Sequence, residues 1–147
     1  MIKASLTWLS GLIALVASPQ AAFSGDAAKG EVVFKKCMIC HSIGPEATIL
    51  IGPVLTGVVG RKAGTYPGFA YSPLMKAAGE NGLFWTEDNI KNYLPDPGAF
   101  LKKFLTEKGK ADLATGSTKM FFRLPGEEDR DNVIAYLKTF SSAPPTQ

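Results

Sequence analysis

Histidine and cysteine are scarce in this chain of 147 residues, which has a single histidine, His41, and two cysteines, Cys37 and Cys40. One histidine excludes a multi-histidine zinc site and a di-iron site in a helical bundle. Two cysteines are too few for a disulfide scaffold. The net charge of +3, from 16 basic and 13 acidic residues, is too small to indicate nucleic-acid binding. A hydrophobic fraction of 46% is ordinary for one globular domain and excludes a disordered chain.

The sequence also lacks an apolar run long enough to span a bilayer, which takes about 20 residues. Its first apolar stretch covers only residues 6–17 and follows a basic residue, Lys3. Ala22-Phe23-Ser24 then places small residues three and one before a plausible cleavage point. We therefore predict that residues 1–24 are a cleaved secretory signal peptide and that the mature chain begins at Gly25. An uncleaved membrane anchor is the alternative.

No alternating strand pattern or internal repeat is present, and helical periodicity in the mature chain is confined to short segments. We predict an all-α fold in which short helices are joined by long ordered loops. The expected helices cover residues 26–40, 72–79, 86–94, 96–108 and 127–140, with irregular loops over 44–68 and 111–120 and a flexible tail over 141–147. Such short helices bury little surface against each other, so a large apolar prosthetic group would supply the missing core.

The motif that carries chemistry is Cys37-Met38-Ile39-Cys40-His41, which has the spacing of a haem-attachment site. Two thiols three positions apart lie on one side of a helical turn, where each can bond one vinyl group of a porphyrin. The next imidazole points toward the iron from the same side, so His41 becomes the proximal ligand. A thioredoxin-like pair would need a strand–helix context and a zinc site two further ligands, and the sequence offers neither. Chance occurrence of the spacing on a surface helix is the remaining alternative. We predict one haem c, attached covalently through Cys37 and Cys40.

The second axial ligand of the iron cannot be another histidine, which makes methionine the candidate. Met38 lies inside the attachment turn and Met1 in the predicted signal peptide, which leaves Met75 and Met120. Met75 falls in a predicted short helix, where a methionine usually belongs to the core. Met120 follows an irregular loop, which presents a thioether to iron more easily than a helix interior does. We therefore favour Met120 as the sixth ligand.

These residues make the chain resemble the class I c-type cytochromes, close to mitochondrial cytochrome c and its soluble bacterial relatives. The similar stretches cover residues 25–140, which the resemblance implies to be one cytochrome c domain. Gly30 and Phe34 resemble the first helix of the family, and Val133-Ile134-Ala135-Tyr136-Leu137 resembles its last helix. An extra stretch over residues 102–116 departs from the mitochondrial pattern just before the favoured methionine.

The resemblance also implies roles for residues around the haem. Gly52-Pro53-Val54-Leu55 is similar to the loop whose proline carbonyl accepts a hydrogen bond from the proximal imidazole, here Pro53 from His41. Thr118-Lys119-Met120 is similar to the axial-methionine motif, and Tyr93 to the tyrosine whose hydroxyl approaches the axial sulfur. The remaining implied contacts are with the haem propionates, from Arg61, Tyr71 and Trp85, and with the haem edge, from Phe122.

The implied function is that of a soluble periplasmic monohaem cytochrome c, an electron carrier of a respiratory or related chain and not an enzyme. With both axial positions filled, the iron is left with one-electron transfer through the exposed haem edge. The expected partners are membrane redox complexes and periplasmic dehydrogenases or oxidases, docked transiently on a monomer by lysines near that edge: Lys35, Lys36, Lys119, Lys102 and Lys103. A haem enzyme or gas sensor with Met120 displaced, and a subunit tethered to a membrane by an unprocessed first segment, are the alternatives.

Overall fold

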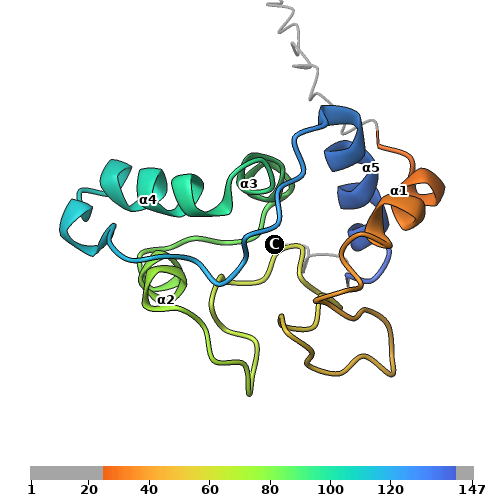
Figure 1. The fold of residues 1–147 in the computed structure, drawn as a ribbon, viewed down its shortest axis with the longest axis horizontal. Helices are drawn as coiled ribbons and strands as arrows, with labels where there is room; N and C mark the ends of the chain where they lie inside the picture. Colours follow the sequence, from red (N-terminus) through yellow and green to blue (C-terminus); the bar gives the residue numbers. More distant parts are fainter. Residues whose placement is uncertain (1–24, 142–147) are drawn as a thin grey trace, which may run out of the picture.

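The computed structural model describes residues 25–141, and within them the fold is all helical, as the sequence predicts (Figure 1). The helices are α1 (Ala27–Phe34), α2 (Pro73–Glu80), α3 (Glu87–Tyr93), α4 (Pro97–Glu107), the short 3₁₀-helix η1 (Ala111–Leu113) and α5 (Glu127–Lys138). None of the helices within residues 25–141 combines the length and apolar character that a membrane span requires. The predicted signal peptide, residues 1–24, lies outside the described residues, as does the predicted tail beyond its first residue.

The starts of four helices are set by capping side chains. In each, the backbone N–H three residues further on donates to the cap at 3.0–3.2 Å, and the caps are Asp26, Ser72, Thr86 and Asp96. These contacts satisfy N–H groups that have no partner inside the helix. Proline follows two of these caps as the first residue of α2 and α4, where its missing N–H costs nothing.

The first helix is shorter than the sequence predicts. A helix over residues 26–40 is expected, but α1 ends at Phe34 and a series of turns continues to Cys40. Hydrogen bonds between residues three apart replace the helical ones, for example from the Cys37 N–H to the Phe34 carbonyl at 2.7 Å. Such tightening satisfies the last carbonyl groups of a helix. The prediction was therefore right about the helix start and wrong about its end.

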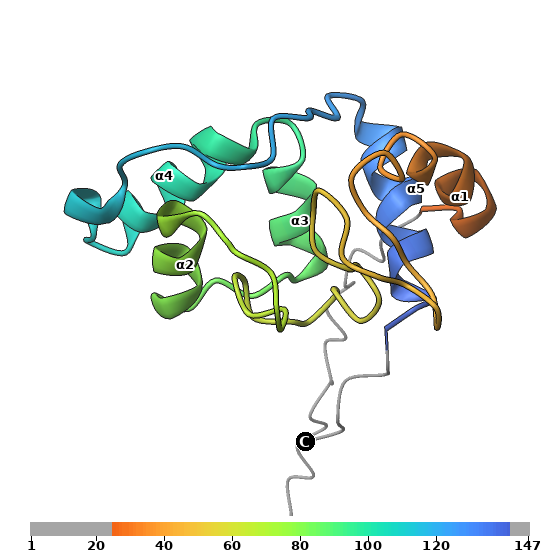
Figure 2. The same cartoon turned by 60° about the horizontal axis from the view of Figure 1, so that its bottom comes forward.

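Helices α1 and α5 lie side by side, although they stand at opposite ends of the chain (Figures 1 and 2). Gly30 lies at their crossing, where a Cβ atom would be 2.0 Å from the backbone oxygen of Asn132. The buried Asn132 side chain accepts a hydrogen bond from the Asp26 N–H at 2.8 Å, which ties the start of α1 to α5. The Phe34 and Tyr136 rings pack across the same interface with centroids 5.3 Å apart.

The rest of the core contains fully buried leucine and isoleucine side chains from α2, α4 and α5, including Leu74, Leu101, Leu105 and Ile134. Helix α3 links them, because it packs against both α4 and α5. The extra stretch over residues 102–116 is part of this architecture. Its first half continues α4, where Leu105 is fully buried, and its second half contains η1. Gly109, with a φ of +71°, ends α4 in a conformation that favours glycine. The insertion therefore lengthens one helix and turns back toward Met120.

Candidate haem-binding site

Both cysteines lie in the turn after α1, and both are free thiols of intermediate exposure. The backbone N–H groups of Cys40 and His41 donate to the Cys37 carbonyl at 3.0 and 2.9 Å, which holds the three residues in one tight turn. Burial raises the pKa of the Cys37 thiol to about 11, against a smaller lowering by Lys36. A redox-active thiol needs a lowered pKa, so this turn does not have the electrostatics of a dithiol redox site.

The His41 imidazole is fixed by the loop that follows. Its Nδ1 lies 2.7 Å from the Pro53 carbonyl oxygen, so Nδ1 carries the proton and donates, and Nε2 keeps its lone pair. Burial lowers the pKa of His41, with the hydrogen bond to Pro53 opposing this, and favours the neutral imidazole that binds metal ions. Gly52 packs directly on the ring, since a Cβ atom there would be 2.4 Å from Cε1. The geometry fits a histidine that ligates iron through Nε2.

Met120 lies in the irregular segment between η1 and α5, half-buried against the core. The Thr118 hydroxyl accepts a hydrogen bond from the Met120 N–H at 3.2 Å, and a further hydrogen bond joins the Thr118 and Tyr93 side chains. Burial raises the pKa of the Tyr93 hydroxyl to about 12, which keeps it protonated at neutral pH. Met75, in contrast, lies buried in α2 as a member of the main core.

Trp85 and Tyr93 pack together in the core with ring centroids 4.8 Å apart. Trp85 also donates its backbone N–H to the Arg61 carbonyl at 2.8 Å, which brings the backbone of the Arg61 loop to this aromatic pair. Tyr93 also contacts the Phe100 ring of α4, with ring centroids 5.9 Å apart. The tyrosine next to the Met120 segment is therefore held by two aromatic rings.

Arg61 and Tyr71, both expected at the propionates, meet through a residue that the sequence analysis missed, Tyr66. The Arg61 guanidinium lies 5.1 Å from the centre of the Tyr66 ring, and the Tyr71 hydroxyl accepts from the Tyr66 N–H at 3.2 Å. Arg61 also donates to the carbonyl oxygens of Val54 and Thr56 at 2.9 and 3.3 Å. Guanidinium has five N–H donors, so these contacts leave others for a carboxylate. An aromatic residue in a glycine-rich loop is the only signal for Tyr66 in the sequence.

Large apolar side chains are exposed around both parts of the site. Phe122, expected at the haem edge, is 38% exposed and its neighbour Phe121 is 78% exposed. Near the cysteine turn the exposed apolar side chains are Met38, Ile39, Ile49, Leu50 and Ile51. Apolar surface of this kind on a small domain indicates a binding site.

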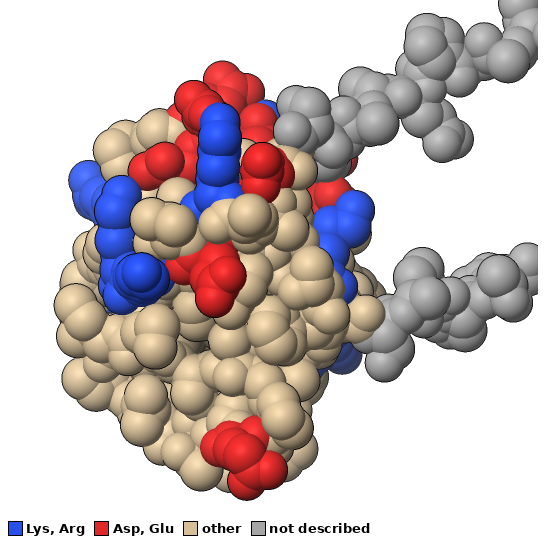
Figure 3. Space-filling model, turned by 90° about the vertical axis from the view of Figure 1, so that its right-hand side faces the viewer, with Lys and Arg blue, Asp and Glu red and all other residues tan. Residues whose placement is uncertain are grey.

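Two lysines on the α1 side of the molecule have acidic neighbours from α5. Lys29 lies 3.3 Å from Glu128, and Lys36 lies 3.1 Å from Asp129. Basic and acidic side chains accordingly gather in the upper part of the face in Figure 3, while its lower part is mostly uncharged. The surface near α1 is therefore of mixed charge rather than uniformly basic.

Comparisons with known proteins agree with this geometry, although no family model matches the chain. Cytochrome c2 iso-1 of Rhodospirillum centenum is 65% identical over 118 residues, covering 80% of this chain and 98% of the relative. A cytochrome c2 of Rhodopseudomonas palustris is 57% identical over 142 residues, covering 95% of this chain and 99% of the relative.

Solved structures give the same result for the fold. The structure of cytochrome c2 from Rhodospirillum centenum superposes with a TM-score of 0.80 at 63% identity, over 80% of this chain and all of that one. The ferricytochrome c2 of Rhodopseudomonas palustris gives a TM-score of 0.75 at 60% identity, over 79% of this chain and 99% of that one. The resemblance and the all-α cytochrome c fold that the sequence predicts are confirmed. The chain therefore belongs to the cytochrome c2 family: it is a class I c-type cytochrome, an electron carrier and not an enzyme, with one covalently bound haem c.

Proposed function

We propose that Cys37 and Cys40 attach the haem, that His41 and Met120 hold its iron, and that the protein passes single electrons between redox partners in the periplasm. The observation that carries the proposal is the hydrogen bond between His41 Nδ1 and the Pro53 carbonyl at 2.7 Å, next to two free thiols. It leaves Nε2 as the only ring nitrogen with a lone pair for iron. When bound, the haem supplies a one-electron couple between ferrous and ferric iron.

The choice of Met120 over Met75 is supported by their surroundings. Met75 is 7% exposed within α2 and packs in the main core, where it is already part of the hydrophobic packing. Met120 lies half-buried in an irregular segment. A thioether on the iron favours the ferrous state and raises the reduction potential, and it fills the second axial position.

The optical spectrum of the purified holoprotein, compared with that of Met120→Ala, tests the proposal. We expect the wild type to show a thioether-linked low-spin haem with the absorption band of sulfur-ligated ferric iron, and to bind carbon monoxide slowly or not at all. Met120→Ala should lose that band, bind carbon monoxide rapidly and have a lower reduction potential, because the sixth position is open. Met75→Leu, a conservative core change, should retain the band.

An unchanged spectrum in Met120→Ala, or loss of the band in Met75→Leu alone, would reject the assignment of Met120. Rapid binding of carbon monoxide by the wild type would instead favour a sensor with an open iron.

The location in the periplasm rests on residues 1–24, which we propose are removed on export. Sequencing of the mature N-terminus should then start at Gly25. Removal takes away one lysine and no acidic residue, which reduces the net charge of +3 by one. A mature chain that still begins at Met1 and fractionates with membranes would indicate the tethered form instead.

We further propose that partners, whether membrane complexes or periplasmic dehydrogenases and oxidases, dock transiently through lysines near the haem. Three of the five expected lysines have local contacts: Lys36 with Asp129, Lys103 with Glu107 at 3.8 Å, and Lys119 with the Ala70 carbonyl. Lys35 and Lys102 are exposed. Neutralising neighbours weaken the field that an approaching partner meets, so the charge steering should be modest.

A salt titration of the bimolecular electron-transfer rate with a solubilised membrane oxidase measures this steering. From low to high salt we expect the rate to fall by about tenfold at most, the lower end of the usual range for steered association. A small neutral reductant serves as control, since its rate carries no charge steering. A flat response with the oxidase would reject docking through lysines.

A further inference from the structure

The segment that carries Met120 is held at both ends by one corner of the fold, residues 93–97, where α3 ends and α4 begins. On the near side of Met120, the buried Thr118 side chain is hydrogen-bonded to the Tyr93 hydroxyl. On the far side, the Leu124 N–H donates to the Leu94 carbonyl at 2.8 Å. Both anchors therefore lie outside the stretch that contains the methionine.

Between these anchors the segment has little support of its own. Within the part of the chain that the structure describes, residues 119–123 make no hydrogen bond from backbone to backbone. Lys119 reaches the Ala70 carbonyl with its side chain, and the Phe121 side chain is mostly exposed. A stretch without backbone hydrogen bonds opens at low cost, so its side-chain contacts decide how firmly it is held.

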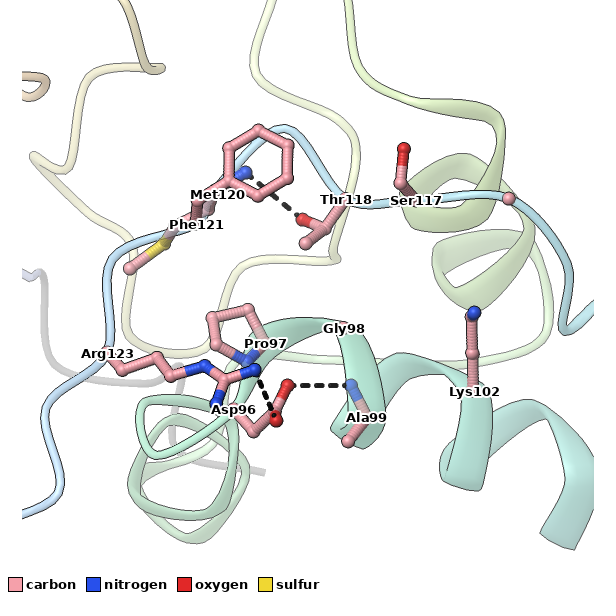
Figure 4. Close-up of a pocket in the computed structure, with 11 residues that line it drawn as sticks. Asp96, Pro97, Gly98, Ala99, Lys102, Ser117, Thr118, Met120, Phe121 and Arg123 are labelled. Carbon is pink, nitrogen blue, oxygen red and sulfur yellow. Dashed lines mark hydrogen bonds and ion pairs between the residues drawn. The ribbon is translucent and has the colours of Figure 1, made fainter.

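The contact after Met120 is an ion pair between Arg123 and Asp96. Arg123 Nη2 lies 2.8 Å from Asp96 Oδ2, and Asp96 Oδ1 accepts from the Ala99 N–H at 3.0 Å as the N-cap of α4 (Figure 4). The cap fixes the carboxylate on a rigid helix end, so the entropic cost of pairing falls mainly on Arg123. One carboxylate thus links the methionine segment to α4.

A pocket of about 380 Å³ lies between this segment and the first turns of α4. Met120 and Phe121 line it from the segment, and Pro97 and Lys102 line it from the helix. Figure 4 shows the Arg123–Asp96 pair crossing from one wall to the other, below Met120. The segment therefore borders this pocket, and the Arg123–Asp96 ion pair connects the segment to α4 across it.

We propose that the Asp96–Arg123 ion pair is a latch on the Met120 segment, which sets how often the sixth position of the iron opens to an external ligand. The inference rests on the proposed function, in which Met120 is that ligand. Asp96 and Arg123 are positioning residues: they touch neither the iron nor the sulfur and act by holding the segment. Because the two side chains are 39% and 64% exposed, the latch is weak and sensitive to salt.

The test uses Asp96→Asn, Arg123→Gln and the double variant of the holoprotein. Asparagine caps a helix as well as aspartate does, so Asp96→Asn removes the charge and keeps α4. The readout is the rate at which imidazole binds the ferric protein at low salt, followed as loss of the sulfur-linked absorption band. For an exposed ion pair we expect each single variant to bind about two- to fivefold faster than the wild type.

Two further results distinguish a latch from a general loss of stability. The double variant should bind no faster than the single ones, because each single change already removes the pair. The wild-type rate should rise with salt while the rates of the variants stay constant, since only the wild type has a pair to screen. Lys29→Gln, which removes the exposed Lys29–Glu128 pair between α1 and α5, is the matched control and should behave as wild type.

Rates equal to wild type in both single variants, or additive increases in the double variant, would overturn the latch. Met120→Ala separates this from failure of the proposed function. If Met120→Ala binds imidazole rapidly and Asp96→Asn does not, the ligand assignment stands and the latch is wrong. If Met120→Ala binds no faster than wild type, the ligand assignment itself is wrong.

Discussion

Replacing Gly52 by alanine is expected to displace the His41 imidazole and disrupt the iron site. A Cβ atom at position 52 would lie 2.4 Å from Cε1, 2.7 Å from Nδ1 and 2.9 Å from Nε2 of the ring. Non-bonded carbon atoms normally stay about 3.5–4.0 Å apart, so either the ring or the loop backbone must move. Both movements break the 2.7 Å hydrogen bond from Nδ1 to Pro53 that orients the ring. The cost should be about 1–3 kcal/mol of folding stability, the usual range for overpacking.

The spectrum and the unfolding midpoint of Gly52→Ala holoprotein measure the two effects together. We expect a low yield of correctly ligated protein, altered axial ligation in the spectrum and a lower midpoint. Gly126→Ala is the matched control, because Gly126 is also outside any helix interior and its added Cβ would be 3.6 Å from the nearest atom. A normal spectrum and normal stability in Gly52→Ala would show that the ring does not pack on this glycine.

Much of the fold could be predicted because its signals are local. Ser72-Pro73 and Asp96-Pro97 mark helix starts through capping and through the fixed φ of proline, and the helices begin there. The end of α1 was missed because residues 35–40 keep helical spacing in sequence while their hydrogen bonds tighten to three-residue turns. The extra stretch over 102–116 was visible as an insertion. Its continuation of α4 was predicted as well, because the expected helix over 96–108 reaches into it, whereas the complete burial of Leu105 is a tertiary contact that no local pattern gives.

In the candidate site, too, some residues could be placed from local sequence and others only from tertiary contacts. Cys37, Cys40 and His41 are adjacent in sequence, and one turn holds them together, so the motif alone places them. The pairing of Arg61 with Tyr66 and the latch between Asp96 and Arg123 are tertiary contacts of exposed or half-exposed polar side chains. From sequence alone, such a side chain could pair with many others. Its partner can be identified only when the fold is known.

The lysine contacts show how such pairing changes a functional expectation. In sequence, Lys36 is one of several cations next to the haem motif. In the structure it lies 3.1 Å from Asp129, which is 93 residues away along the chain. The close packing of α1 on α5 brings the acidic first turn of α5 to these lysines. The charge steering that we propose therefore depends on the same helix crossing that organises the core.

That crossing leaves no room for a side chain at position 30, and Gly30→Ala should cost about 3 kcal/mol of stability or more. An added Cβ would lie 2.0 Å from the Asn132 backbone oxygen and 2.8 Å from the Tyr136 Cβ. A backbone carbonyl inside α5 cannot rotate away without breaking its helical hydrogen bond. The two helices must separate, which also strains the hydrogen bond from the Asp26 N–H to Asn132.

Helix propensity predicts the opposite sign, since alanine stabilises a helix interior over glycine by about 1 kcal/mol. Gly98→Ala supplies the comparison: Gly98 is also helical, in α4, and its added Cβ would meet nothing closer than 3.7 Å. Chemical unfolding should therefore separate the two holoprotein variants, with Gly98→Ala unchanged or slightly stabilised and Gly30→Ala strongly destabilised. Equal stabilisation of both would mean that propensity decides at Gly30 and that α1 and α5 do not approach within backbone contact. The larger penalty at Gly30 follows because steric overlap with a fixed carbonyl exceeds any gain in helix propensity.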